Sequence, residues 1–390
     1  SLLLAILGVC TLGFGYYVAP YSGVLRVFPQ VSLPINHNKA ELFSLVFGLG
    51  LPLISRTTDY LPAQFKFQFS AVIKLLQNQS LVAIVLLGGI CYLDKKRKRT
   101  RFLLYLVVLV AVIQGASTGM LEQAVVPIIA LLLIRWQYLR RLPVLSLATA
   151  LLIFVFLSPV KQSYREAVWY GDSSAQILDS PIDKVSLWFR QASEYWIDTL
   201  NGEKTINEST EQASSRLDLI HQLAHIYSRT PSVVPYQYGT TYSFFLVALI
   251  PRAIWPDKPE AGSANYFYGV NYEITTEEGG LRSTFGVGLV GESFINFGWA
   301  GVILIMALQG VILSLIQFIF GERESNLGGQ AILIAFFVYF LNGIGSSAEI
   351  LFGNIFQNLI FSTLLLWWIR EKQTSKSVPH TAMLTSVGGK

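Results

Sequence analysis

The chain has 390 residues, of which 52% are hydrophobic and 14% charged, and its net charge is +5. Soluble domains carry about 25% charged residues, so this composition excludes an ordinary soluble domain. Both cysteines, Cys10 and Cys91, lie within apolar runs, which excludes a disulfide framework and a Cys-based metal or redox site.

Nine apolar runs approach the length that crosses a bilayer as a helix, about 20 residues. They comprise residues 2–19, 40–55, 79–94, 102–119, 122–139, 143–160, 299–320, 327–345 and 351–369. The first lacks a basic n-region and a cleavage motif, so we interpret it as a spanning helix and not as a signal peptide. The sequence thus predicts an all-α polytopic membrane protein with about nine transmembrane helices.

The charges indicate how these helices are oriented. A basic loop, Lys95 to Arg101, separates two apolar runs. The positive-inside rule puts this loop in the cytoplasm, and we favour that interpretation over nucleic-acid binding. Alternation then puts residues 161–298 outside, and this interval holds 16 of the 24 acidic residues but 10 of the 29 basic ones. We therefore expect an N-terminal bundle (1–160), a large extracytoplasmic loop (161–298), C-terminal helices (299–370) and a cytoplasmic tail (371–390).

Helical patterns continue within this loop. Pro181 to Leu200 spaces its aromatic residues as an amphipathic helix, which favours a position in the membrane interface. A second helix is expected from Ser214 or Ser215 to Arg229, because serine is a good N-cap and Pro231 ends the helix. The apolar piece Tyr242 to Ile250 is too short to span, and it is expected to be re-entrant or interfacial.

Two segments of the loop have a distinctive pattern. Residues 249–259 read LIPRAIWPDKP, and residues 291–298 read GESFINFG. In these segments the chain resembles the O-antigen polymerases, the Wzy-type oligosaccharide repeat-unit polymerases of bacterial membranes. The resemblance extends from about Ser117 to Ile369 and includes the pair Tyr164-Arg165 and Arg216.

The resemblance implies a membrane glycosyltransferase, similar in architecture to the GT-C type, in the bacterial inner membrane with its loop in the periplasm. Such an enzyme joins oligosaccharide units carried on undecaprenyl pyrophosphate into O-antigen, capsule or exopolysaccharide, without a metal or another cofactor. A flippase and a chain-length regulator would be its partners. Two alternatives stay open: ligase-like transfer from the same carrier to another acceptor, and a transporter of lipid-linked sugars.

A lipid-pyrophosphate donor needs cations at the membrane surface, because negative charge develops on the leaving group. Guanidinium groups bind phosphate oxygens in a bidentate manner. We predict Arg252 and Arg282 as catalytic residues, with substrate-binding roles for Lys258, Arg216 and Arg165. The alternative is that these are ordinary loop cations paired with nearby acids or with lipid headgroups.

The acceptor hydroxyl needs a base or an orienting carboxylate. Glu292 is the first candidate, with Asp218 and His221 as alternatives, although Glu292 could equally be a carboxylate that favours a helix entry. His221 and His225 are four residues apart, which would suit a metal, but a polar face on a wet cavity is the favoured interpretation. Further substrate contacts are predicted for Tyr164, Trp255, Asn296 and His225.

Overall fold

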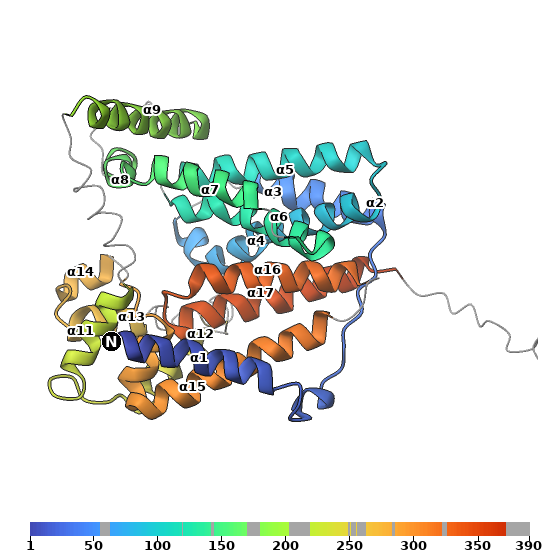
Figure 1. The fold of residues 1–390 in the computed structure, drawn as a ribbon. Helices are drawn as coiled ribbons and strands as arrows, with labels where there is room; N and C mark the ends of the chain where they lie inside the picture. Colours follow the sequence, from blue (N-terminus) through green and yellow to red (C-terminus); the bar gives the residue numbers. More distant parts are fainter. Residues whose placement is uncertain are drawn as a thin grey trace, which may run out of the picture.

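The computed structural model describes residues 1–54, 63–118, 120–141, 144–169, 180–202, 219–248, 250, 255, 263–282, 285–321 and 326–371. Regular structure in these residues is helical throughout (Figure 1). The expected helix start at Ser214 or Ser215 and most of the expected tail at 371–390 lie outside the described residues.

A helix occupies each predicted apolar run. These helices are α1 (Leu2–Val18), α2 (His37–Phe43) with its continuation through the π-helical η2 (Ser44–Gly50) into α3 (Leu51–Ile54), α4 (Ala63–Leu93), α5 (Lys98–Ser117), α6 (Leu121–Leu139), α7 (Val144–Leu157), α15 (Leu289–Gly321), α16 (Leu327–Gly343) and α17 (Ala348–Ile369). Among the described residues, four segments are long and apolar enough to cross a membrane: Ala71–Leu93, Lys98–Ser117, Leu289–Gly321 and Ala348–Ile369. The chain is therefore a helical, membrane-associated protein.

Further helices fill the region between α7 and α15. They are α8 (Lys161–Trp169), α9 (Pro181–Leu200), α11 (Leu219–Arg229), α12 (Thr240–Ala248), α13 (Ser263–Asn271) and α14 (Glu277–Arg282), and a 3-10 turn, η1 (Val24–Val27), follows α1. The predicted helix at Pro181 to Leu200 is confirmed, and the Ser180 side chain caps it by accepting from the Ile182 N–H at 3.2 Å. The predicted end of α11 at Arg229 is also confirmed.

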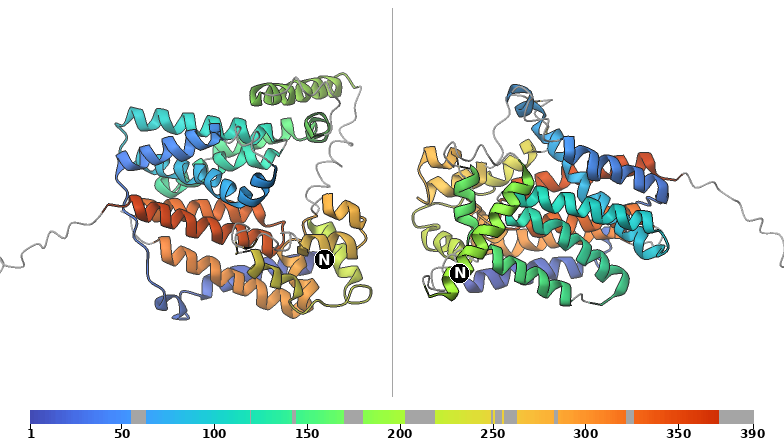
Figure 2. Two further views of the ribbon diagram at one scale, coloured as in Figure 1. Left: turned by 180° about the vertical axis from the view of Figure 1, so that it is seen from behind. Right: turned by 90° about the horizontal axis from the view of Figure 1, so that it is seen from above.

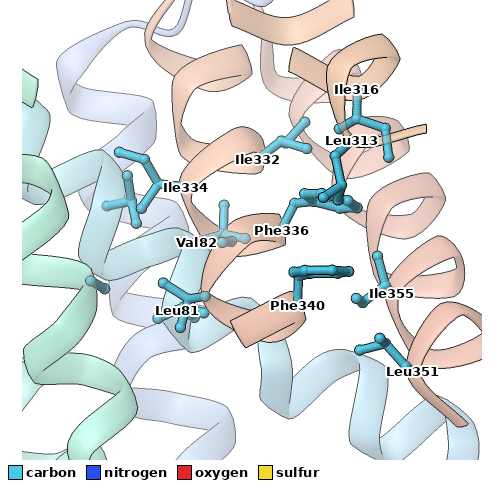
Figure 3. Packing of buried hydrophobic residues seen from close by; sticks show 14 of the residues in the cluster. Leu81, Val82, Leu313, Ile316, Ile332, Ile334, Phe336, Phe340, Leu351 and Ile355 are labelled. Atoms are coloured by element: carbon cyan, nitrogen blue, oxygen red, sulfur yellow. The ribbon is translucent and has the colours of Figure 1, made fainter. Parts of the chain in front are cut away.

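The core of the bundle is centred on α16. Ile332, Phe336 and Phe340 of this helix pack between Leu81 and Val82 of α4, Leu313 and Ile316 of α15, and Leu351 and Ile355 of α17 (Figure 3). All nine side chains are buried. Close packing of this kind makes α15 and α17 a rigid frame for whatever lies at their ends.

Distant segments meet at one end of the bundle. There the Asn36 Nδ2–H donates to a Glu371 carboxylate oxygen at 2.7 Å, while Arg97 and Arg99 lie 3.8 and 3.6 Å from the buried Glu41 carboxylate. The short helices of the 161–298 region gather at the opposite end (Figures 1 and 2). The basic loop, the start of α2 and the end of α17 thus share one end, as the charge pattern requires.

Helix α15 is not one continuous helix. Phe297 (φ −139°, ψ 16°) and Gly298 (φ 61°, ψ −146°) leave helical geometry and divide it into residues 289–296 and a long helix from Trp299. The prediction of a spanning helix from Trp299 therefore matches the second part. The preceding short helix was missed, and it carries most of the GESFINFG segment.

Candidate functional site

Glu292 lies at the centre of a buried hydrogen-bond chain. Only 1% of this residue is exposed. Its Oε1 accepts from the Thr241 hydroxyl at 2.9 Å, and its Oε2 accepts from the Ala348 N–H at 2.6 Å. The two oxygens therefore hold two segments that are far apart in sequence.

Asn296, one helical turn further along α15, extends this chain. Its Nδ2 group donates to the Thr241 hydroxyl oxygen at 2.7 Å and to the Glu292 carbonyl at 2.8 Å. Its Oδ1 accepts from the Gly239 N–H at 2.9 Å. We call Thr241, Glu292, Asn296 and the Gly239 and Ala348 amides the Glu292 network.

The network joins three helices. Thr241 is in the first turn of α12, Glu292 and Asn296 are in the first part of α15, and Ala348 is the first residue of α17. The N-cap residue of α17, Ser347, makes no side-chain hydrogen bond to the helix, so Glu292 supplies the acceptor for a free N–H group there. Fully satisfied buried networks of this kind favour one arrangement of the elements they join.

Further contacts fix α12 along its length. The Tyr242 hydroxyl lies 3.2 Å from the Ser293 hydroxyl, and the Phe245 ring packs against Phe356 of α17 with centroids 6.0 Å apart. Helix α12 ends at Ala248, immediately before the segment 249–259. The two segments that carry the family resemblance are thus connected through α12.

This geometry bears on the predicted roles of Glu292 and Asn296. A general base must reach the proton it removes, and here both carboxylate oxygens of Glu292 already accept hydrogen bonds in a site closed to solvent. Asn296 is likewise fully buried, and both ends of its amide are used internally. The structure favours a positioning role for both residues over the predicted proton transfer and substrate contact.

Helix α11 carries the predicted histidines. His221 is exposed, whereas a ring nitrogen of His225 lies 2.8 Å from the Tyr272 carbonyl and holds α11 against the end of α13. Nearby, Arg229 donates to Glu273 at 2.7 Å and holds the pKa of that exposed carboxyl below its usual range. Among the residues that the structure describes, no group of three His, Cys, Asp or Glu side chains could hold a metal ion.

Tyr164 has a different environment from the one predicted. It is 0% exposed, its ring stacks on Trp188 of α9 with centroids 4.5 Å apart, and its hydroxyl donates to the Ala116 carbonyl at 3.3 Å. Burial raises its pKa to about 12. The structure gives Tyr164 a packing role in place of the predicted substrate contact, in a hydrophobic cluster separate from the main core.

The remaining predicted site residues are the cations, Asp218 and Trp255. Arg252, Lys258, Arg216 and Asp218 lie outside the described residues. Arg165 of α8 and Arg282, the last residue of α14, have described backbones only, and Trp255 is exposed. Their joint action on a phosphate stays a prediction.

Sequence reasoning missed Thr241, which is the bridge between Glu292 and Asn296. A threonine before an apolar run is common, so its type and position give no signal. Nothing in the sequence indicates that Glu349, buried at the start of α17, lies close enough to Glu292 for their charges to interact.

These features define a class, that of a helical membrane-associated protein with a buried polar network at one end of its bundle. Residues 18–376 match the family described as "Domain of unknown function (DUF8712)". The chain belongs to this family. No curated protein and no solved structure matches it.

Proposed function

We propose that this protein is a bacterial inner-membrane glycosyltransferase that polymerises oligosaccharide units carried on undecaprenyl pyrophosphate. It would cross the membrane nine times with a GT-C-like arrangement and act at the periplasmic surface. A flippase would supply its substrate, and a chain-length regulator would limit its product. Ligase-like transfer to a different acceptor is the closest alternative, because it uses the same donor chemistry.

One observation carries this proposal. The two segments on which the resemblance rests, 249–259 and 291–298, are separated in sequence, yet the Glu292 network ties the helix leading into the first to the helix formed by the second. If the two segments act in one reaction, they must lie close together, and the link between their helices supports this. The starts of α15 and α17 lie at the end of the bundle where the helices of the 161–298 region gather (Figure 1).

In the proposed reaction an acceptor sugar hydroxyl attacks the anomeric carbon of the donor glycan. The new C–O bond forms as the bond from that carbon to the pyrophosphate oxygen breaks, and undecaprenyl pyrophosphate leaves with the bonding electrons. Arg252, Arg282 and Lys258 would bind the leaving pyrophosphate, with Arg216 and Arg165 as further cations. The hydroxyl proton would pass to His221, which is exposed on α11, or to Asp218.

In this scheme Glu292 and Asn296 act through α12 and do not touch the substrate. They would hold α12 in the position from which residues 249–259 reach the donor. Small displacements of catalytic groups reduce rates strongly, so a rigid support for Arg252 is functionally important. Trp255 and the loop tyrosines would offer flat apolar faces to sugar rings.

Transport is the competing class of function. A transporter places ionisable or unpaired polar groups along a path between its helices. Gln309 Oε1 of α15 and Asn358 Oδ1 of α17 are buried without a hydrogen-bond partner, but two other polar side chains of the described spans bond across helix contacts: Ser362 donates to Gln79 at 2.9 Å, and Tyr339 donates to the Asn78 carbonyl at 2.8 Å. These bonds are those expected of groups that hold helices together.

The test is reconstitution into vesicles with lipid-pyrophosphate-linked oligosaccharides extracted from the native host. We expect chains longer than the supplied unit, and we expect Arg252→Ala to lose this activity. Arg190→Ala is the matched control, because Arg190 is exposed on α9, away from the Glu292 network. Full activity of Arg252→Ala would overturn the site, and movement of the lipid between leaflets without elongation would favour a transporter.

A further inference from the structure

Five aromatic side chains surround the break in α15. They are Tyr227 of α11, Tyr236 and Tyr238 of the turn that follows it, and Phe297 and Trp299 of α15, and we call them the aromatic collar. The rings of Tyr227 and Trp299 are 6.1 Å apart, and those of Tyr236 and Tyr238 are 6.3 Å apart. Tyr227 and Tyr236 also pack on the buried Phe294 ring, at 5.5 and 6.4 Å.

The geometry of the break holds the collar together. A side chain at Gly298 would come within 2.8 Å of the Tyr236 hydroxyl, so glycine is needed both for this contact and for the positive φ of 61°. Two backbone bonds attach the turn to α15: the Gln237 N–H donates to the Ile295 carbonyl, and the Tyr238 N–H donates to the Asn296 carbonyl, both at 3.1 Å. The collar is therefore built from three segments that these contacts hold together.

The collar is exposed and lacks charge. Four of its side chains are exposed, and Tyr238 is 76% exposed. Residues 230–250 and 293–321 contain no Asp, Glu, Lys or Arg. A surface segment in contact with water normally carries charges, and a contiguous exposed apolar surface indicates a partner that covers it.

The collar is continuous with a surface suited to lipid. Immediately beyond the break, α15 exposes Ile303, Leu304 and Leu308 on a segment long and apolar enough to cross a membrane. Tyrosine and tryptophan concentrate where a bilayer meets water, because each ring has an apolar body and a polar group. Helix α11 lies beside α15, at the end of the bundle where the helices of the 161–298 region gather (Figures 1 and 2).

We propose that the aromatic collar binds the headgroup boundary of the bilayer and seats α11 and residues 230–239 on the membrane. The partner is the lipid surface itself. The Glu292 network adjoins the collar through Gly239 and Asn296, so it would lie at the level of the lipid headgroups. This inference does not depend on glycosyl transfer, and it assigns a depth in the bilayer to the candidate site.

Spin-label depth measurements in vesicles test the proposal. In a background with Cys10→Ala and Cys91→Ala, a nitroxide is attached at Tyr238→Cys, and its accessibility to oxygen is compared with its accessibility to a water-soluble nickel complex. Leu304→Cys is the lipid reference, and Glu277→Cys, exposed on α14, is the water reference. We expect a several-fold higher oxygen-to-nickel ratio at Tyr238 than at Glu277, but a lower ratio than at Leu304.

The proposal would be overturned if the Tyr238 label has the same oxygen-to-nickel ratio as the Glu277 label while the Leu304 label has the high ratio expected in lipid. The proposal would also be overturned if the spectrum of the Tyr238 label broadens as the protein-to-lipid ratio rises, because that result would assign the collar to contact between copies of the chain. If Tyr238→Cys fails to fold, Val233→Cys, exposed in the same turn, gives the same comparison.

Discussion

Replacing Glu292 separates a positioning role from a catalytic one. Glu292→Ala removes both acceptors and leaves the Ala348 N–H and the Thr241 O–H, two buried donors, without acceptors. Each unsatisfied buried group costs roughly 1–3 kcal/mol, so we expect the free energy of unfolding to fall by about 2–6 kcal/mol. Glu292→Gln keeps one carbonyl acceptor and nearly the same volume, and should cost only about 1–2 kcal/mol.

The two roles predict different activities for the glutamine variant. A general base contributes roughly 10²–10⁴-fold to a rate, and a glutamine side chain cannot replace it. If Glu292 only positions α12, Glu292→Gln should retain polymer formation within about tenfold of the wild type, which corresponds to about 1.4 kcal/mol. Glu292→Ala should lose stability and activity together.

Reversible unfolding by SDS in mixed micelles measures the stability, and polymer formation in vesicles measures the activity. Glu277→Gln is the matched control, since Glu277 is exposed on α14, and it should leave both quantities unchanged. A glutamine variant that folds normally but loses more than about a hundredfold in rate would refute the positioning role. An alanine variant as stable as the wild type would refute the network itself.

Three further substitutions test the described contacts by the same unfolding assay. Thr241→Val keeps the shape but breaks the bonds to Glu292 and Asn296, so stability should fall by about 1–3 kcal/mol, and no change would contradict the bridging role. Gly298→Ala should cost about 1–3 kcal/mol because of its backbone geometry, whereas Gly13→Ala, with open space around it, should cost nothing. Tyr164→Phe should lower stability by about 0.5–1.5 kcal/mol without changing KM, and a raised KM at unchanged stability would restore its predicted substrate contact.

The helices were largely predictable because their signals are local. A run of apolar residues determines a helix whatever its partners are, and every predicted run coincides with helical structure. The start of α9 follows from Ser180 and Pro181, two adjacent residues that favour a helix start. The gathering of the basic loop and the end of α17 at one end of the bundle follows from charge and from alternation along the chain.

Contacts between distant residues were not predictable. Nothing near Thr241 in the sequence indicates that it meets Glu292, and nothing near Tyr164 indicates that Trp188 covers it, because each contact depends on how separate helices pack. Glu292 illustrates the difference. Its sequence context alone fits both a base and a helix-entry carboxylate, and the choice rests on which groups face its two oxygens, which only the tertiary structure decides.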